Sequence, residues 1–334
     1  MNSPDKAIRC GVVLAAGEGR RLRPFVQQLR GDFLPKQYVR FVGTRSMLEH
    51  TFSRAEKLIP PERLFTVISR KHLSHPEVRQ QLSQRPQDRL VVQPENKETG
   101  PGILLPLMHV EKRYPDSTVA VLPSDHFVAE EGLFMSYVDL AFRIVERHPS
   151  YLILLGIQPT APEAEYGYIV PGPKVDFLAP LPVLGLARFV EKPRSYIAEE
   201  LIRKGGLWNT MVIVSKVRTL LDLVRDSAPG LYRCFETIGR SIGTSREKDV
   251  VERSYRQMEP VNFSSDLFEA FPVERVLVLP VRGVVWSDWG SKRRVLDFLK
   301  QRHGSDRFRT LSRNRSAATT ACAWLDVKKS TIIS

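Results

Sequence analysis

Apolar runs of strand length alternate with helix-like segments along the first half of this chain. The apolar runs are "CGVVLAA", "RLFTVIS", "STVAVLPSDH" and "YLILLGI". Apolar positions recur at helical spacing in "SMLEHTFSRAEKLI" and "LFMSYVDLAFRIVERH", and "TGPGILLPLMHVEKRY" resembles a loop that opens a helix. We expect Pro60 and Pro61 to stop the first helix, and Pro106 to lie near the first turns of the helix after the loop. The alternation predicts an α/β domain with a mostly parallel, doubly wound sheet.

The second half of the chain is less regular but still mixes both kinds of segment. Further strands are indicated by "YGYIVPG", "GLARFVEKP", "TMVIVSK" and "ERVLVLPVRGVVWSDWG". A short helix is expected in "SYIAEELIRKGG", with Ser195 as its N-cap and Gly205 at its end, and a last helix in "KRRVLDFLKQRH". Periodicity fades after Gly304, so we expect residues 303–334 to form a mobile basic tail.

The composition and net charge indicate the kind of partner the chain binds but do not identify it. The chain has 334 residues, 42% of them hydrophobic, and a formal net charge of +13. That charge favours an anionic partner, such as nucleic acid, acidic lipid or a phosphorylated small molecule. Three widely separated cysteines argue against a disulfide framework or a zinc module. The polar N-terminus, and the lack of any apolar run approaching about 18 residues, predict a cytoplasmic protein without a membrane partner.

A glycine turn with three arginines follows the first apolar run, in "GVVLAAGEGRRLRPF". Backbone N–H groups approach an anion closely where glycine leaves out the Cβ atom. The turn is not a P-loop, because Gly17 lacks the required partners, and it is not a dinucleotide fingerprint, because Leu22 stands where a third glycine belongs. Taken alone, the segment is equally compatible with a plain β-to-α turn carrying solvated arginines.

The downstream sequence favours phosphate chemistry. "LAAGEGRRLRP" followed by "LPKQ" resembles the signature of sugar-1-phosphate nucleotidyltransferases, which reads G-x-G-[ST]-R-L-x-P and then P-K-x. The alignment makes Arg21 the family arginine and Lys36 the family lysine, while Arg20 replaces the usual small hydroxyl residue.

The resemblance continues in order from Ile8 to Phe298 and is nearest to bacterial mannose-1-phosphate guanylyltransferases. Seven further segments carry it: "SMLEHTF", "VVQPENKETGPGI", "VAVLPSDHFV", "LLGIQPTAPEAEYGYI" (family "GI-x-P-x-x-P-E-T-GYGYI"), "ARFVEKP", "GGLWNTMVIV" and "VVWSDWGSKRRV". The resemblance implies a Rossmann-like, doubly wound mixed sheet in an α/β/α sandwich, the GT-A-like nucleotidyltransferase fold. It implies one nucleotidyltransferase domain at 1–302, with a nucleotide-binding half at 8–130 and a sugar-phosphate-binding half at 131–302.

The reaction implied by the resemblance is attack of a sugar 1-phosphate oxygen on the α-phosphorus of a nucleoside triphosphate, with release of pyrophosphate. Both reactants are polyanions, so the reaction needs cations, a metal ion and rigid positioning. Asp125 and Asp288 each end an apolar run, and ligands of open α/β sheets lie beyond the strands' carboxyl ends. We expect the two carboxylates to bind one Mg²⁺, although an aspartate after a strand is also a common helix N-cap. His126 is expected to be structural, because Mg²⁺ prefers oxygen ligands.

The resemblance also assigns roles to further residues. The catalytic residues are Arg21, Lys36, Asp125 and Lys192. The nucleotide-binding residues are Ala15, Ala16, Gly17, Gly19, Arg21, Lys36, Gln93, Lys97, Thr99 and Ser124. The sugar-phosphate-binding residues are Gly167, Glu191, Lys192 and Asn209. Without the family context, Glu191-Lys192 reads as an exposed strand end and Gly167 as a bulge.

Besides Arg20, two segments near the expected substrate sites depart from the family pattern. The base-reading "R-N-T-A-P" is "KETGP" here, so Glu98 replaces an asparagine, and "WNTMVIV" lacks a glycine. The resemblance implies GTP and mannose 1-phosphate, giving GDP-mannose, as the leading substrates, and these departures leave another triphosphate or sugar 1-phosphate open. A non-catalytic sugar-nucleotide-binding relative is a second alternative. A nucleic-acid partner is not expected, because no recognition module accompanies the charge. A homo-oligomer is left open.

Overall fold

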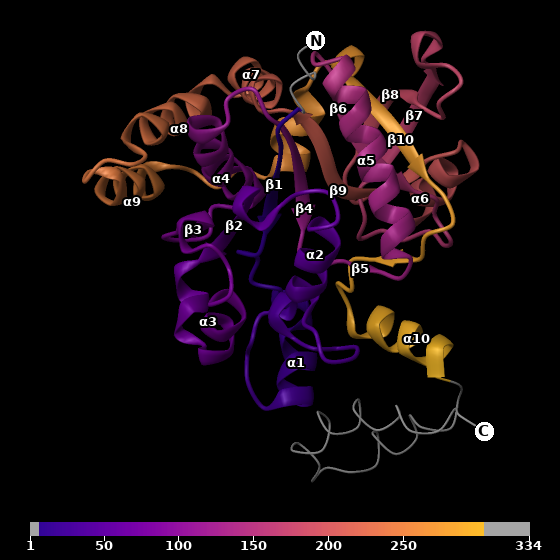
Figure 1. The fold of residues 1–334 in the computed structure, drawn as a ribbon. Coiled ribbons are helices and arrows are strands. Elements are labelled where there is room, and N and C mark those ends of the chain that lie inside the picture. Colours follow the sequence, from indigo (N-terminus) through magenta and orange to yellow (C-terminus); the bar gives the residue numbers. More distant parts are fainter. Residues whose placement is uncertain (1–6, 304–334) are drawn as a thin grey trace, which may run out of the picture.

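The computed structural model describes residues 7–303, and its centre is a nine-stranded sheet with helices on both faces (Figure 1). Along the sheet the strand order is β3-β2-β1-β4-β9-β6-β10-β8-β7. The strands are β1 (Arg9–Leu14), β2 (Leu64–Ser69), β3 (Leu90–Gln93), β4 (Thr118–Pro123), β6 (Leu152–Ile157), β7 (Tyr168–Lys174), β8 (Leu184–Val190), β9 (Leu207–Lys216) and β10 (Val276–Val281). A separate small ribbon pairs β5 (Phe127–Val128) with β11 (Trp286–Ser287).

Strand directions divide the sheet into a parallel part and a mixed part. The neighbouring pairs β3–β2, β2–β1 and β1–β4 are all parallel. Strand β9 lies between β4 and β6 and runs antiparallel to both, while β10 is parallel to β6. Strands β8 and β7 complete the sheet with antiparallel pairings. The predicted doubly wound mixed sheet is confirmed.

The helices cover two faces and one end of the sheet. They are α1 (Arg23–Arg30), α2 (Met47–Ala55), α3 (Pro76–Leu82), α4 (Thr99–Arg113), α5 (Glu131–Arg147), α6 (Ser195–Arg203), α7 (Val217–Ser227), α8 (Pro229–Ser241), α9 (Glu247–Gln257) and α10 (Lys292–His303). Side chains of a strand alternate between faces, so Val119 and Val121 of β4 join the core with α4, α7 and α8. Ala120 and Leu122 join the opposite core with α5.

A third apolar cluster lies beyond the carboxyl ends of β1 and β2. It contains side chains of α1, α2, α3 and α10, and its central ring is the buried Trp289. Trp289 packs edge-on against Phe41 and stacks on Phe127. This apolar cluster packs against the segments that follow β1 and β4 and supports them.

Local sequence signals explain the start of α2 and the end of α6. The Ser46 side chain accepts a hydrogen bond from the Glu49 N–H at 3.1 Å, and the Glu49 carboxylate accepts from the Ser46 N–H at 2.6 Å, which is a capping box for α2. Helix α2 ends at Ala55, and turns at residues 56–58 separate it from Pro60 and Pro61, which were expected to stop it. Gly205, at φ 81°, ends the turn after α6 in the left-handed conformation.

Two expectations about helices were wrong, and three helices were missed. Helix α4 begins at Thr99 itself, so Pro106 lies in its middle rather than near its start. The helix starts early because the carbonyl of Val261 accepts the otherwise unpaired N–H of Gly100 at 2.8 Å. The N-cap of α6 is Arg194, whose extended backbone precedes the helix, and Ser195 is the first helical residue. Helices α7 to α9 were not anticipated, although their apolar faces build the core over α4.

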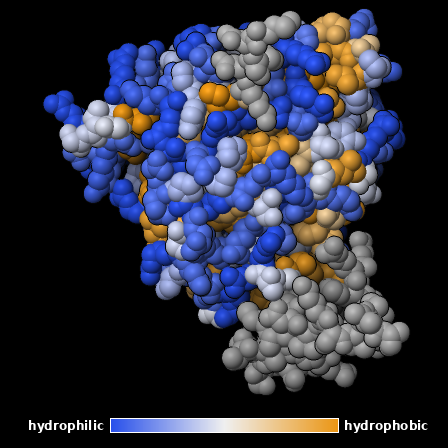
Figure 2. Space-filling model, viewed as in Figure 1, coloured by the Kyte–Doolittle hydropathy of each residue, from blue (hydrophilic) through white to orange (hydrophobic). Residues whose placement is uncertain are grey.

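The surface, the apolarity of the helices and the end of α10 bear on the expectations about partners and the tail. The face seen in Figure 2 is mainly hydrophilic, with separate apolar spots. None of the helices within residues 7–303 is both long enough and apolar enough to cross a membrane. The predicted tail at 303–334 lies outside the described residues apart from His303, at which α10 ends.

Candidate active site

Strand pairing places the glycine turn beside Asp125. β1 and β4 are parallel neighbours, with Leu14 opposite Pro123, so the segments after both strands leave the sheet at one edge. Ser124 fixes this arrangement, because its N–H and its hydroxyl both donate to the Leu14 carbonyl, at 3.2 and 2.6 Å. Asp125 therefore faces the turn at residues 15–19.

The segment from Lys36 to Tyr38 supports the turn. The Gln37 side-chain amide donates to the carbonyls of Ala15 and Gly17, both at 2.8 Å, and the Tyr38 hydroxyl donates to the Ala15 carbonyl at 3.0 Å. Gly19 is left-handed at φ 57°, and a Cβ atom there would lie 3.2 Å from Lys36 Cγ. Glycine therefore lets the turn close over the Lys36 stem.

Lys36 is buried and links the two aspartates. Its Nζ lies 2.9 Å from Asp125 Oδ2 and donates to the main-chain carbonyl of Asp288 at 2.7 Å. Burial is the largest single influence and would raise the pKa of the Asp125 carboxyl, but the charge of Lys36, its hydrogen bond and further neighbouring groups together outweigh burial, so the pKa lies below its ordinary value. Asp125 is thus an anion at neutral pH, paired with the predicted catalytic lysine.

The small ribbon brings Asp288 to the same place from the far end of the chain. Ser287 of β11 pairs with Phe127 of β5, which follows Asp125 closely in sequence. Asp288 Oδ2 lies 3.5 Å from Arg21 Nη2, and Oδ1 accepts the Gly290 N–H at 2.8 Å. The structure therefore unites Arg21, Lys36, Asp125 and Asp288, four residues singled out from the sequence.

Two charged residues of this cluster were missed from the sequence. Arg294 of α10 places Nε 3.2 Å from Asp288 Oδ1, and it also pairs with Glu165 in the loop before β7. Glu165 Oε2 lies 3.2 Å from Arg21 Nη1. The signal was present, because Glu165 stands where the family pattern quoted above has a glycine, but the pattern alone does not show what a side chain there would touch.

Gly290 makes room for this convergence. A Cβ atom on Gly290 would lie 2.6 Å from Asp288 Oδ2, 2.7 Å from Arg294 Nη2 and 2.8 Å from Arg21 Nη2. Three charged groups therefore meet over a position that only glycine can occupy without displacing them. The glycine of "DWGSK" has a steric role in the cluster.

His126 lies behind the cluster and stays neutral. Burial lowers the pKa of its imidazole below the ordinary value, despite the nearby Asp125 carboxylate. The ring packs edge-on against Trp286 with centroids 5.0 Å apart, and Arg54 donates to the His126 carbonyl at 3.3 Å. These contacts agree with a structural role for the residue.

The predicted sugar-phosphate residues form a second group. The Asn209 N–H donates to the Gly167 carbonyl at 2.8 Å, and Lys192 Nζ lies 3.0 Å from Glu191 Oε1. A Cβ atom on Gly167 would lie 2.7 Å from Glu191 Oε2, so glycine is needed here for packing within the chain as well. The four residues come from three adjoining segments of β7, β8 and β9.

Tyr166 joins the two groups. Its carbonyl accepts the Lys192 N–H at 3.2 Å, while its hydroxyl lies 3.4 Å from Ser287 Oγ, next to Asp288. Its ring lies under the guanidinium of Arg294, 4.7 Å from the centroid. One residue therefore contacts the predicted sugar-phosphate residues through its main chain and the aspartate cluster through its side chain.

The predicted base-reading segment is held by a distant loop. Val261 N–H donates to the Lys97 carbonyl at 3.1 Å, and Phe263 N–H donates to the Thr99 hydroxyl at 2.8 Å. Nearby, Gln93 is buried, and its Oε1 has no hydrogen-bond partner within residues 7–303. An unpaired buried acceptor is costly in a folded protein and marks a position where a ligand N–H would be stabilised.

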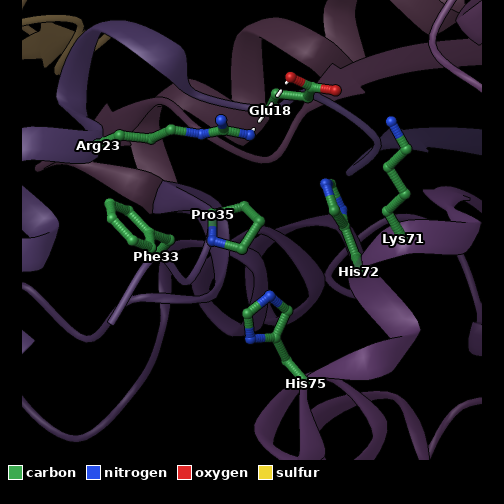
Figure 3. A pocket seen from close by; sticks show the side chains of 7 residues that line it. All are labelled: Glu18, Arg23, Phe33, Pro35, Lys71, His72 and His75. Carbon is green, nitrogen blue, oxygen red and sulfur yellow. Dashed lines mark hydrogen bonds and ion pairs between the residues drawn. The ribbon is translucent and has the colours of Figure 1, made fainter. Parts of the chain in front are cut away.

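A pocket of about 300 Å³ lies on another side of the glycine turn (Figure 3). It is lined by Glu18, Arg23, Phe33, Pro35, Lys71, His72 and His75. Glu18 and Arg23 form an ion pair at 3.3 Å across its upper rim in this view. None of the predicted site residues lines it.

The carboxylate pair suits a hard divalent cation. Lys36 contacts the Asp125 carboxylate and the Asp288 main-chain carbonyl, which brings two aspartates from different segments together, and Mg²⁺ commonly takes one or two protein carboxylates plus phosphate oxygens. No cluster of three or more His, Cys, Asp or Glu residues suited to a metal occurs within residues 7–303. The donors therefore fit a metal that is shared with a phosphorylated substrate.

Comparison with known proteins agrees with this geometry. The profile of the nucleotidyl transferase family matches residues 10–303, and the chain belongs to that family. The xanthan biosynthesis protein XanB of Xanthomonas campestris is 27% identical over 297 residues, which cover 87% of this chain and 59% of XanB. Mannose-1-phosphate guanylyltransferase 2 of Escherichia coli O157:H7 is 26% identical over 316 residues, which cover 88% of this chain and 60% of that protein.

A solved structure supports the same relationship. The Thermus thermophilus protein titled mannose-1-phosphate geranyltransferase superposes with a TM-score of 0.72 at 29% identity. The match covers 86% of this chain and 79% of that one. The chain thus spans roughly three fifths of XanB and of the Escherichia coli relative, and most of the solved structure.

Proposed function

We propose that this chain transfers a nucleotidyl group from a nucleoside triphosphate to a sugar 1-phosphate, with release of pyrophosphate. The observation that carries the proposal is the Lys36 ammonium, which joins the Asp125 carboxylate to the Asp288 main chain beside Arg21. Two cations and two carboxylates at one sheet edge can bind polyphosphate and a divalent metal together. Membership of the nucleotidyl transferase family supports the same reaction.

In this mechanism the residues of the chain bind the two substrates and orient their phosphate groups for the reaction. The backbone of the turn at residues 15–19 approaches the phosphates, and Arg21 and Lys36 balance the charge that develops at the α-phosphorus. Asp125 and Asp288 would hold Mg²⁺, which when bound neutralises phosphate charge. Lys192 positions the attacking phosphate, and Tyr166 keeps it at a fixed distance from the aspartates.

We propose GTP and mannose 1-phosphate as the substrates. Relatives named as mannose-1-phosphate guanylyltransferases support this pair. The buried, unpaired Gln93 Oε1 and the carboxylate of Glu98 are acceptors, and guanine offers N1–H and N2–H₂ donors. Glu191 and Asn209 are placed to bind sugar hydroxyls.

The test is a screen for pyrophosphate release with four nucleoside triphosphates, several hexose 1-phosphates and Mg²⁺. We expect the fastest turnover with GTP and mannose 1-phosphate. The Asp125→Asn variant removes charge but little volume, and we expect it to lower kcat by about 100-fold or more. Faster turnover with another pair would show that the proposed substrates are wrong. No turnover with any pair would refute the proposed enzyme activity and would favour a protein that only binds sugar nucleotides.

A further inference from the structure

Glu165 occupies a position that the family pattern reserves for glycine, and its carboxylate enters the aspartate cluster. Its Oε2 lies 3.2 Å from Arg21 Nη1 and also pairs with Arg294 Nη2. The Arg21 guanidinium is therefore shared between two carboxylates, those of Glu165 and Asp288. This residue has no counterpart in the family pattern.

Arg294 prevents Glu165 from swinging freely into solvent. The arginine is 9% exposed and holds Asp288 Oδ1 at 3.2 Å and Glu163 Oε2 at 3.1 Å while it contacts Glu165. A buried guanidinium with several carboxylate partners is a fixed anchor rather than a mobile surface charge. Glu165 is thereby presented to Arg21.

Arg21 itself is half exposed, with 50% of its side chain accessible. Carboxylate and phosphate oxygens compete for the same guanidinium donors, because both form charge-assisted hydrogen bonds with it. We propose that Glu165 is an affinity-setting residue, which occupies Arg21 in the free protein and is displaced by the phosphates of the incoming triphosphate. The inference rests on the proposed function only in assigning Arg21 to the triphosphate.

Glu163 provides a matched control in the same loop. It lies two residues earlier and pairs with Arg293 at 2.9 Å and with Arg294 at 3.1 Å, and none of its ion pairs among the described residues involves Arg21. Removing its charge takes one carboxylate partner from Arg294, as removing that of Glu165 does. Of the two changes, only the one at Glu165 also removes a carboxylate partner from Arg21, which keeps its contact with Asp288.

The experiment measures binding of inorganic tripolyphosphate with Mg²⁺ by calorimetry, which avoids dependence on the base or the sugar. We expect Glu165→Gln and Glu165→Gly to lower the Kd about threefold to tenfold at low ionic strength. The gain should shrink at high salt, because exposed ion pairs are screened. Glu163→Gln should bind within about twofold of the wild type.

Three results would overturn the inference. The first is unchanged or weaker binding by both Glu165 variants, with thermal unfolding like that of the wild type. The second is an equal gain in Glu163→Gln, which would assign the effect to Arg294. The third is no binding by any of the proteins. Loss of all turnover in the substrate screen, with the Glu165 effect on tripolyphosphate intact, would refute the proposed function and leave this inference standing.

Discussion

At the scale of single residues, the environment of His72 shows how burial fixes a charge state beside the glycine turn. The imidazole is 4% exposed, and its Nδ1 lies 3.4 Å from the Tyr38 hydroxyl that supports Ala15. Burial lowers the pKa of His72 from 6.5 to about 4. The folded protein therefore keeps this side chain neutral at physiological pH.

This shift makes stability depend on pH. Between about pH 6.5 and about pH 4 the unfolded chain binds a proton at His72 and the folded chain does not. The free energy of unfolding should therefore fall as pH is lowered through this window, with about 3 kcal/mol from His72. Urea unfolding of the wild type and of His72→Gln, measured from pH 7.5 to pH 4.5, checks this.

The variant should show a shallower pH dependence, although not a flat one. His126 also has a lowered pKa, so it adds a dependence of the same sign in both proteins. Parallel pH profiles for the variant and the wild type would contradict the assignment to His72.

Individual residues differ in how far sequence could predict them. Arg21, Lys36, Asp125 and Asp288 lie in segments whose order matches a known pattern, and the structure brings the four together. Arg294 contacts Glu165 across 129 positions of sequence. No local pattern encodes such a pair, because its geometry depends on how α10 packs.

At the scale of elements, the start of α4 depends on a loop that is far away in sequence. The Val261 carbonyl accepts the Gly100 N–H at 2.8 Å, and a Cβ atom on Gly100 would lie 2.8 Å from that same carbonyl. The segment that includes Lys97 and Thr99 is held through this contact. Sequence predicted the helix but not its first turn, since the partner of that turn lies beyond α9.

Gly100→Ala should separate α4 from the Val261 loop. The added methyl group meets backbone, which cannot rotate away, so we expect a loss of about 1–3 kcal/mol in the free energy of unfolding. The KM for the nucleoside triphosphate should rise, because Lys97 and Thr99 shift. Urea unfolding and steady-state kinetics measure the two effects.

Gly102→Ala is the matched control two residues further along α4. Its Cβ atom would lie 3.8 Å from Gln93 Oε1, an ordinary contact distance. Alanine is a better helix former than glycine, so this variant should be as stable as the wild type or more stable, by up to about 1 kcal/mol. Equal behaviour of the two variants would show that the contact with Val261 does not hold the segment.

At the scale of the whole molecule, strand β9 joins the two predicted halves into one continuous sheet. The strand belongs to the half at 131–302, yet it lies between β4 of the other half and β6. The alternation of apolar runs predicted a mostly parallel sheet and not this insertion, because antiparallel pairing of distant strands leaves no periodic trace. Neither half can complete its sheet alone.

The continuous sheet predicts that residues 7–303 unfold as one cooperative unit. Strand β2 lies on one side of β9 and β10 on the other, so opening either one fully should require disruption of the whole sheet. Hydrogen exchange of peptides covering these two strands should give the same opening free energy, and the calorimetric and van't Hoff enthalpies should agree. Two separate transitions, or a β10 that exchanges well before β2, would mean that the halves are independent domains. The proposed substrates would contact Lys36 of one half and Lys192 of the other. In a single cooperative unit, their binding should raise the opening free energy of β2 and of β10 by the same amount, and hydrogen exchange with the substrates bound measures both values.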